Sequence, residues 1–600
     1  MSETLKERSE MDPQYMWDLS SLYKDDAAWE EDLKALDPLI QHMSTFQGKL
    51  KDAVTIYNCL EADTALDRKL SNLFVYANVR KSEDTRAEAA QSLYMRIYAK
   101  YVEAISSTAF ISPEILSLPE DKLKEIAKDP VLEPYAFTME KLLKQKPHTL
   151  SAKEEQLLAS FGEVFAAPAE IATNLQDADL VFEDCTDSEG KPHEVTDSNY
   201  INLQMSEDRV LRKNSFKKYY KGYRQHINTF ASTYSGTVKG AVVEARARHY
   251  GSSREMFMAG ENIPVSVYDS LIEAVRNHLP AMYRYVDLRK KMLGIGDLHY
   301  YDVYAPLVAG SDRKYSYEEA QQLVLAAVEP LGKKYGDIVR GAFRDRWIDV
   351  YPNKGKSGGA YSTGSYDSNP FIMANYMDNL DSVSTIAHEM GHSVHTWFSH
   401  HAQPPQYADY TIFVAEVAST VNENLLTQLL LKDTKDPKER LALLNHYLEG
   451  FKGTVYRQTM FAEFEKGAHA MAEQGQPLTP AALNELYGGL VKDYFGPALI
   501  MDDEVESEWA RIPHFYSPFY VYKYATSYSA AVAISEAILN DGESAVTPYL
   551  EFLHMGGSQY PLDELRHAGV DLSTPEPVNR ALDKFEQVLD EAEKLADEIQ

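Results

Sequence analysis

The chain has 600 residues, 44% hydrophobic and 25% charged, a balance typical of a folded globular protein rather than a disordered or fibrous one. The 91 Asp and Glu residues outnumber the 60 Lys and Arg residues, and the formal net charge of -31 repels phosphate backbones and anionic lipid surfaces. We therefore expect no nucleic-acid partner and no membrane partner. The two cysteines, Cys59 and Cys185, lie far from each other in the sequence, which disfavours a disulfide framework or a thiolate zinc site.

The N-terminal residues predict no export. Charges run through the segment from Met1 to Tyr23, which lacks the apolar core of a secretory signal. No stretch approaches the roughly 18 consecutive apolar residues of a membrane span. We expect a cytoplasmic protein; the sequence indicates neither a partner protein nor an oligomeric state.

Helical patterns dominate the first part of the chain. Apolar residues recur at three- and four-residue spacing from Ala27 to about Ala178. The segment from Leu180 to about Asn202, with Gly190 in its centre, then predicts a β-hairpin. We place a boundary there, between an N-terminal mostly helical lobe, residues 1–200, and a catalytic domain, residues 201–600.

The second part is also mainly helical, with one exception. Between Trp347 and Tyr376, glycines and Pro352 interrupt Val, Tyr and Ile residues in a pattern that predicts a small β-sheet. Helices are expected at Glu207–His249, Ser316–Tyr335, Asp381–His400, Asp409–Leu431, Pro437–Gln474, Pro518–Ala537 and Pro577–Gln600. The sequence therefore predicts a mainly α, multi-helix fold.

The motif His388-Glu389-Met-Gly-His392 predicts a zinc site. Residues four apart lie one turn apart on one helix face, so both imidazoles can bind one Zn²⁺, while Glu389, about 100° round the helix, reaches the metal-bound water. The opposite side of the helix is apolar and can anchor it. One zinc per chain is expected.

His395 lies on the same helix face but does not fit as the third ligand. Its Cα rises about 10.5 Å along the axis from that of His388, too far for bonds of about 2.0–2.1 Å to a shared ion. The extended metzincin motif would need Gly at position 395 and His at position 398, where this chain has His395 and Phe398. The third ligand must therefore come from another element.

The next helix carries two acidic residues on an otherwise apolar face, Glu416 and Glu423. A carboxylate among Val, Ala and Ile needs a partner, and catalytic zinc sites commonly use two His and one Glu. We predict that Glu416 is the third metal ligand and that Glu423 supports a ligating histidine. Ordinary buried hydrogen bonding remains the alternative for both.

At these residues the sequence resembles the thimet oligopeptidase superfamily of zinc peptidases, and most closely its bacterial branch, oligoendopeptidase F. The resemblance covers the HEMGH motif at 388–392, FVAEVASTVNEN at 413–424 and the segment from Asp349 to Tyr361. It implies a two-lobed helical ellipsoid with a deep substrate channel, and short oligopeptides as substrates. It also implies a strand that pairs with the substrate backbone, which would fall at Gly358, Gly359, Ala360 and Tyr361; a plain tight turn is equally compatible with the glycines.

The resemblance further implies a His and several Tyr that hydrogen-bond the oxyanion of the reaction. The candidates in this chain are His514, Tyr520 and Tyr524. The spacing from His514 to Tyr520 is one residue longer than in the thimet type, and a packing role is the alternative for each tyrosine. Tyr520, Tyr524 and Tyr528 are expected to share a helix face.

The predicted activity is that of a zinc metalloendopeptidase that cuts internal bonds of short peptides. Zinc polarises the scissile carbonyl and activates its water, and Glu389 is the general base. One alternative is a related helical HExxH metallocarboxypeptidase, which would need a receptor for a free carboxylate. The other is a catalytically silent peptide- or metal-binding protein, which the intact Glu389 disfavours.

Overall fold

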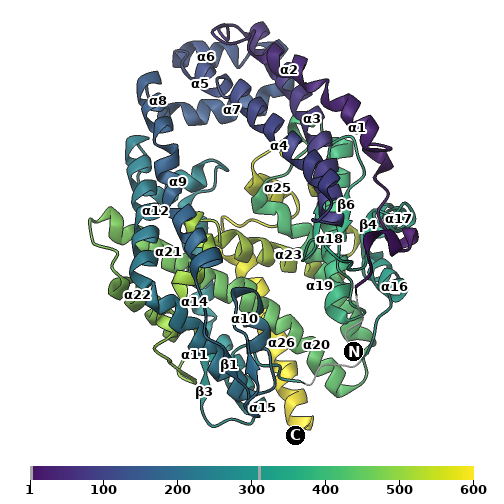
Figure 1. Ribbon diagram of the computed structural model, residues 1–600, viewed down its shortest axis with the longest axis vertical. Coiled ribbons are helices and arrows are strands. Elements are labelled where there is room, and N and C mark those ends of the chain that lie inside the picture. Colours follow the sequence, from purple (N-terminus) through teal and green to yellow (C-terminus); the bar gives the residue numbers. More distant parts are fainter. Residues whose placement is uncertain (1–4, 309–312, 600) are drawn as a thin grey trace. The chain divides into compact units, whose positions relative to one another are not determined.

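A computed structural model of the protein describes residues 5–308 and 313–599 (Figure 1). The chain is mostly helical with small sheets of two or three strands, so the predicted mainly α fold is confirmed. Contacts group the chain into two compact units, each made of three segments. Unit 1 comprises Met1–Ala152, Arg313–Leu429 and Ile534–Val570, and unit 2 comprises Lys153–Asp312, Leu430–Ala533 and Asp571–Gln600.

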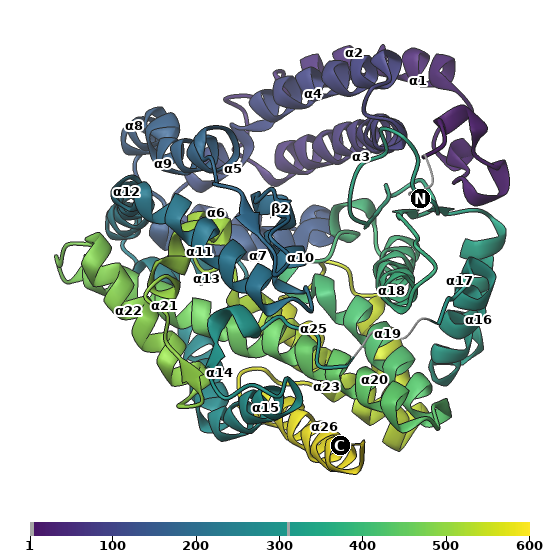
Figure 2. The ribbon, with the colours of Figure 1, turned by 60° about the horizontal axis from the view of Figure 1, so that its bottom comes forward.

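Unit 1 contains helices from both halves of the sequence. They are α1 Asp26–Leu33, α2 Leu36–Met43, α3 Ala53–Glu83, α4 Glu88–Thr108, α5 Ile111–Leu116, α6 Glu120–Ile126, α7 Ala136–Gln145, α16 Tyr317–Ala327, α17 Gly332–Arg344, α18 Leu380–Ala402, most of α19 Ile412–Asp433, α24 Glu543–Leu553 and α25 Pro561–His567. The long helix α3 begins after Asp52, whose side chain accepts a hydrogen bond from the backbone N–H of Thr55. Its apolar residues pack against α2 and α4, and Figure 2 shows α3 and α4 side by side.

A three-stranded sheet in unit 1 has the order β4-β6-β5. The strands are β4 Ile348–Asp349, β5 Tyr361–Thr363 and β6 Phe371–Met373. Strand β6 is parallel to β4 and antiparallel to β5, so β5 is an edge strand. Phe371 and Met373 of β6 pack in a buried cluster with Val75 and Val79 of α3, which fixes the sheet on this helix. The sheet predicted between Trp347 and Tyr376 is confirmed.

Unit 2 is also helical. Its elements are α8 Ala152–Ser160, α9 Gly162–Asn174, α10 Asp197–Gln204, α11 Arg209–Gln225, α12 Ile227–Ala247, α13 Ser253–Ala259, α14 Val265–Asn277, α15 Leu279–Met292, α20 Pro437–Phe451, α21 Arg457–Glu473, α22 Pro480–Phe495, the first part of α23 Tyr522–Asp541, α26 Glu576–Ile599, and the short strands β1 Cys185–Thr186, β2 Pro192–His193, β3 Leu298–His299 and β7 Leu499–Ile500. Strands β1 and β2 form the predicted hairpin. Its second strand is shorter than predicted, because Thr196 caps α10 with a side-chain hydrogen bond and turns the chain into a helix.

A buried carboxylate organises the core of unit 2. Glu508 is fully buried, and its oxygens accept hydrogen bonds from the guanidinium groups of Arg457 at 2.8 Å and Arg511 at 2.9 Å. The hydroxyl groups of three tyrosines also donate to Glu508; they are Tyr220, Tyr300 and Tyr487. Burial raises the pKa of Glu508, but the two guanidinium groups outweigh it and hold the pKa far below its usual value.

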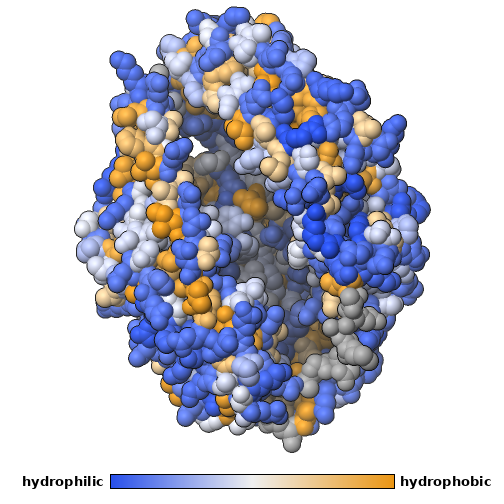
Figure 3. Space-filling view, in the orientation of Figure 1, coloured by the Kyte–Doolittle hydropathy of each residue, from blue (hydrophilic) through white to orange (hydrophobic). Residues whose placement is uncertain are grey.

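The surface agrees with the composition. Figure 3 shows mainly hydrophilic residues on the visible face, with hydrophobic residues scattered among them. Within residues 5–308 and 313–599, no helix has the length and apolar character needed to cross a membrane. The division at about residue 200 and the substrate channel between lobes stay predictions.

Candidate metal centre and active site

Helix α18 carries the HExxH motif in a buried setting. It begins after Asn379, whose side chain accepts a hydrogen bond from the N–H of Ser382 at 2.8 Å. Its back is apolar and fully buried: Val383, Ile386, Met390 and Val394 are each 0% exposed. This anchoring directs the opposite face, with His388 and His392, towards α19.

Helices α18 and α19 approach each other closely at Gly391. A Cβ atom at this position would lie 2.5 Å from the Cα of Ser419 and 2.6 Å from the backbone oxygen of Ala418, closer than real Cβ contacts. About one helix turn from this contact, the Asn422 side chain donates a hydrogen bond to the backbone oxygen of Ala387 at 3.1 Å and accepts one from Tyr335 at 2.8 Å. Because α19 is held this close, Glu416 reaches the two histidines.

Three ligand atoms from the two helices lie together. The Nε2 atoms of His388 and His392 are 3.2 Å apart. The Oε2 atom of Glu416 lies 3.3 Å from His388 Nε2 and 3.5 Å from His392 Nε2. Among the residues that the structure describes, these three are the group of His, Cys and acidic side chains that could hold a metal ion.

The donor set fits a zinc ion. Ligands of a tetrahedral zinc with bonds of about 2.0–2.1 Å are separated by about 3.3 Å. The three observed distances of 3.2, 3.3 and 3.5 Å match this value. Two imidazole nitrogens and one carboxylate oxygen are also a common catalytic zinc set, which leaves a fourth position open.

Glu416 and His388 are electrostatically coupled. Burial raises the pKa of Glu416, but hydrogen bonds from His388 and His392 outweigh it and hold the pKa well below its usual value. Burial lowers the pKa of His388, but hydrogen bonds to Glu416 and Glu423 raise it well above normal. Ser419 also donates a hydrogen bond to Glu416 Oε2 at 3.1 Å. Glu416 is therefore held as a carboxylate, the form that binds a metal.

Glu389 lies beside the cluster and is only 7% exposed. Burial raises its pKa, and the imidazoles of His388 and His392 oppose this effect in part. A carboxyl group with a raised pKa retains a proton more readily, which suits a group that must both accept and return one.

Glu423 contacts the other nitrogen of His388. Its Oε1 atom lies 3.3 Å from His388 Nδ1. Metal binding would displace the Nε2 proton of His388; the ring would then donate its Nδ1–H to Glu423 and present the lone pair of Nε2 to the ion. This is the geometry expected of a residue that supports a ligand.

His395 is outside the metal group. It is 1% exposed, its ring stacks on that of Tyr410 at a centroid distance of 3.8 Å, and burial lowers its pKa to about 3. The Tyr410 hydroxyl in turn pairs with Thr396 at 3.1 Å. His395 is a neutral packing residue of α18.

The predicted substrate-binding segment leads into the edge strand β5. Gly359 adopts a left-handed φ of 77°, and a Cβ atom on Gly358 or Gly359 would meet nothing within 4 Å. The backbone oxygen of Gly359 accepts a hydrogen bond from Asn375. Tyr361, the first residue of β5, donates a hydrogen bond to Ser82 Oγ at 2.8 Å. The segment before β5 therefore bends at the exposed residues Gly358 and Gly359, and Ala360 is half-buried.

His514, Tyr520 and Tyr524 come together in unit 2. The Tyr524 hydroxyl lies 3.4 Å from His514 Nε2, and the ring of Tyr520 lies 6.2 Å from that of His514 and 5.4 Å from that of Tyr524. Helix α23 begins only at Tyr522, because Phe519 has a positive φ of 56°, so the shared helix face predicted for Tyr520, Tyr524 and Tyr528 is wrong. Tyr528 is 9% exposed and packs against Phe451.

Sequence reasoning missed three positions that build the centre. Gly391 sets the helix approach, Asn422 joins the two helices, and Ser393 Oγ lies 2.8 Å from Ser362 Oγ of β5. Signals existed for two of them. A glycine inside a helix costs about 1 kcal/mol relative to Ala and so suggests a packing reason, and Asn422 is polar in an apolar helix, as Glu416 is.

Comparisons with known proteins agree with this geometry. The sequence profile of peptidase family M3 matches residues 202–584, and that of oligopeptidase F matches residues 114–182. The chain belongs to peptidase family M3. It is 45% identical to oligopeptidase PepF of Bacillus subtilis over 98% of this chain and 88% of that protein, and 41% identical to group B oligopeptidase PepB of Streptococcus agalactiae over 98% of both.

Solved structures give the same result. A putative peptidase from Chlamydophila abortus matches with a TM-score of 0.93 and 35% identity, covering 99% of this chain and 100% of that one. Oligoendopeptidase-F from Enterococcus faecium matches with a TM-score of 0.75 and 36% identity, covering 96% of this chain and 99% of that one. The predicted resemblance is confirmed, and this M3 peptidase is a metalloendopeptidase that acts on oligopeptides. Neither the carboxypeptidase nor the silent binding protein is favoured.

Proposed function

We propose that His388, His392 and Glu416 hold one Zn²⁺ and that Glu389 is the general base for hydrolysis of internal peptide bonds. The observation that carries this proposal is the set of three ligand atoms with separations of 3.2, 3.3 and 3.5 Å, beside the buried Glu389. Zinc bound there supplies a Lewis acid that polarises the scissile carbonyl and makes water more acidic.

The chain's own residues perform the proton transfers. Glu389 takes a proton from the attacking water and delivers it to the leaving amine as the peptide bond breaks. Its raised pKa supports both steps, since the same group must accept and then donate. Glu423 keeps His388 oriented through the contact at Nδ1.

We further propose roles for two segments. The edge strand β5 and the turn before it, Gly358 to Tyr361, would pair with the backbone of a short peptide, a mode that uses an unpaired strand edge. His514 and Tyr520 would donate hydrogen bonds to the oxyanion, with Tyr524 beside them. Support for these donors is that the three side chains gather in unit 2.

The proposed catalytic domain is residues 201–600, and the match of the family M3 profile to residues 202–584 supports it. The N-terminal lobe would then be residues 1–200. The cytoplasmic location expected from the sequence stays a prediction.

The substitution Glu389→Gln tests the general base. It should lower kcat by about 10²- to 10⁴-fold, because proton transfer is lost, and leave the zinc content at one per chain. Activity is measured with an internally quenched peptide capped at both ends, and zinc by elemental analysis. Cleavage of the capped peptide also excludes a carboxypeptidase.

The control is Glu88→Gln, the same chemical change at an exposed position of α4, which should keep parental activity. Near-parental turnover by the Glu389→Gln variant would show that another group is the base. Treatment with a chelator should abolish activity of the parent, and added zinc should restore it.

A further inference from the structure

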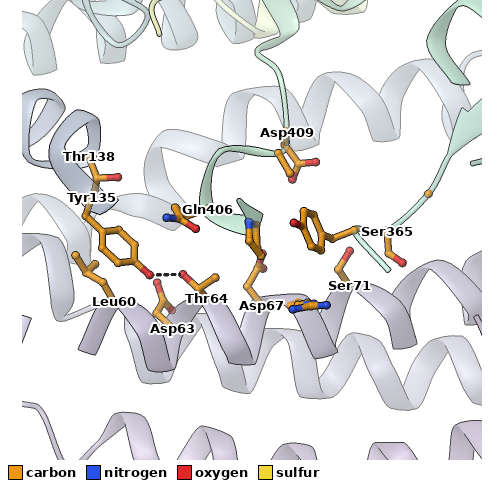
Figure 4. Close-up of a pocket in the computed structure, with 15 residues that line it drawn as sticks. Leu60, Asp63, Thr64, Asp67, Ser71, Tyr135, Thr138, Ser365, Gln406 and Asp409 are labelled. Carbon is orange, nitrogen blue, oxygen red and sulfur yellow. Dashed lines mark hydrogen bonds between the residues drawn. The ribbon is translucent and has the colours of Figure 1, made fainter. Parts of the chain in front are cut away.

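Unit 1 contains a pocket that the catalytic centre does not use. Its volume is about 310 Å³, at the lower end of the range for ligand sites, about 300–1,000 Å³. Residues of α3, of η4 (Pro130–Tyr135), of the segment that follows β5 and of η9 (Pro405–Tyr407) line it (Figure 4). Four segments that are far apart in sequence therefore form one cavity.

The pocket is negatively charged. Asp63, Asp67 and Asp409 line it, and the guanidinium of Arg68, which also lines it, is bound to Asp367, with 2.8 Å between Nε and Oδ2. Asp63 is half-buried, yet in the part of the chain that the structure describes its carboxylate has no hydrogen-bond donor and no ion-pair partner. Burial, and then the charge of Asp67, raise the pKa of Asp63 to about 6.

The neighbouring groups satisfy Asp409, which contacts His400 Nε2 at 3.4 Å, but not Asp63 or Asp67. The Tyr135 hydroxyl, which also lines the pocket, donates to Glu61 at 2.8 Å and pairs with Thr64 at 3.0 Å instead. Burying an uncompensated carboxylate is costly, which applies to the half-buried Asp63, while Asp67 one helix turn away is exposed. The pocket therefore offers two acceptors, Asp63 and Asp67, to a cation from outside.

A second group in the wall is also unpartnered. Ser365 is 2% exposed, and its Oγ has no hydrogen-bond partner within the described residues. In the view of Figure 4, Ser365 and Tyr135 stand at opposite ends of the pocket. Because Ser365 lines the pocket, its hydroxyl can hydrogen-bond a ligand there.

The pocket and the metal centre lie at different points along α18, the helix that carries His388 and His392. Ser362 of β5 contacts Ser393, directly after His392, at 2.8 Å between the Oγ atoms. Three residues on, the backbone oxygen of Ser365 accepts a hydrogen bond from His400 at 3.2 Å. Three strand residues span about 10 Å, and seven helix residues also span about 10.5 Å, so the chain after β5 runs along α18 as far as the pocket.

We propose that this pocket binds a positively charged group of the substrate peptide, the ammonium or guanidinium of a residue about three positions before the scissile bond. The inference rests on the proposed function, because it uses pairing of the peptide with β5 beside the metal centre. Antiparallel pairing, the commoner arrangement of neighbouring strands, directs the N-terminal part of the peptide towards Ser365. Asp63 and Asp67 accept hydrogen bonds from the cation. Ser365, at the other end of the pocket, hydrogen-bonds a different polar atom of the peptide.

Three internally quenched peptides test the proposal. The first has Lys three residues before the cleaved bond, the second has Gln there, and both are acetylated. The third begins at that position with a free α-amino group on Gln. The parent should show a kcat/KM roughly 10- to 100-fold higher for the Lys peptide than for the Gln peptide, as expected of charge-assisted hydrogen bonds. A matching gain for the third peptide would identify the α-ammonium as a second source of the charge.

The double variant Asp63→Asn, Asp67→Asn should lose this preference and keep kcat/KM for the Gln peptide within about twofold of the parental value. Asp67→Asn alone should lose part of it, and Glu88→Gln, a charge loss elsewhere in unit 1, should lose none. An equal preference in parent and double variant, or no preference in the parent, overturns the proposal. Failure of the parent to cleave any of the peptides would instead overturn the proposed function.

Discussion

Glu416 in unit 1 and Glu508 in unit 2 are both carboxylates whose pKa is held far below normal, yet their surroundings differ. Two guanidinium groups and three tyrosine hydroxyls saturate Glu508, which is 0% exposed. Glu416 contacts two imidazoles and one hydroxyl, and its side chain is 36% exposed.

The difference shows what distinguishes a carboxylate that can bind a metal from one that stabilises the core. A perturbed pKa marks both groups and therefore does not separate them. The partners do: arginines cannot give up their protons, so Glu508 is permanently neutralised, whereas imidazoles can be neutral and share an ion with Glu416. Incomplete pairing with groups that can bind a metal is the informative feature.

The sharpest test is the same substitution at both positions. Glu416→Gln should remove most of the metal affinity and lower activity by about 10³-fold or more, with little change in Tm, because a ligand is lost at a half-buried site. Glu508→Gln should keep zinc but destabilise the fold by about 3–5 kcal/mol, because two buried guanidinium groups lose their counter-ion. Zinc content, kcat/KM and Tm are measured for both. Equal loss of zinc in the two variants would show that metal binding does not distinguish Glu416 from Glu508.

Substitutions of His514 and Tyr520 test whether unit 2 also contributes to catalysis. His514 lies six residues after Glu508, the buried carboxylate in the core of this unit. His514→Gln and Tyr520→Phe should each lower kcat by about 10²- to 10³-fold, the cost of one oxyanion donor, while KM, zinc content and Tm stay near the parental values. Steady-state kinetics check this. Tyr528→Phe, at a packed position, is the control and should keep parental kcat. A loss confined to Tm would assign His514 and Tyr520 to packing.

Glu423 differs from both Glu416 and Glu508, since it contacts the proposed metal ligand His388 and is not itself a ligand. Glu423→Gln should weaken zinc binding by about 10- to 100-fold, as supporting residues of zinc sites do. Competition with a chelator of known affinity measures this. Activity should return at saturating zinc, and a loss that zinc does not rescue would give Glu423 another role.

Glu564 in α25 is another buried carboxylate, and its neighbours offset almost none of the cost of burying its charge. It is 1% exposed, Oε1 has no partner within the described residues, and burial raises its pKa from 4.5 to about 8. The folded state holds the proton more tightly than the unfolded state, so this contribution to stability is full below about pH 4.5 and is lost as the pH rises through 8.

Glu564→Gln should therefore stabilise the protein relative to the parent at pH 9, by up to a few kcal/mol, and have little effect at pH 5. Thermal unfolding at the two pH values measures the difference. Activity at pH 7 should not change. The same Tm difference at both pH values would mean that Glu564 is already paired.

Much of the metal centre could be predicted from the sequence. The spacing of His388 and His392 and the position of Glu389 follow from the period of a single helix, a local property. Glu416 was predicted because a carboxylate in an apolar helix needs a partner. The edge strand β5 was expected between Trp347 and Tyr376, but its pairing order was not, because register depends on contacts with the rest of the fold.

The sequence by itself determined the family, the mainly helical fold and the identity of the HExxH residues, since each rests on local spacing along the chain. Only the tertiary structure decided how closely α19 approaches α18 at Gly391, and that Ser365 and Asp63, 302 positions apart in number, line one pocket. Such contacts join segments that have no fixed spacing. Long-range packing, rather than local periodicity, decides them.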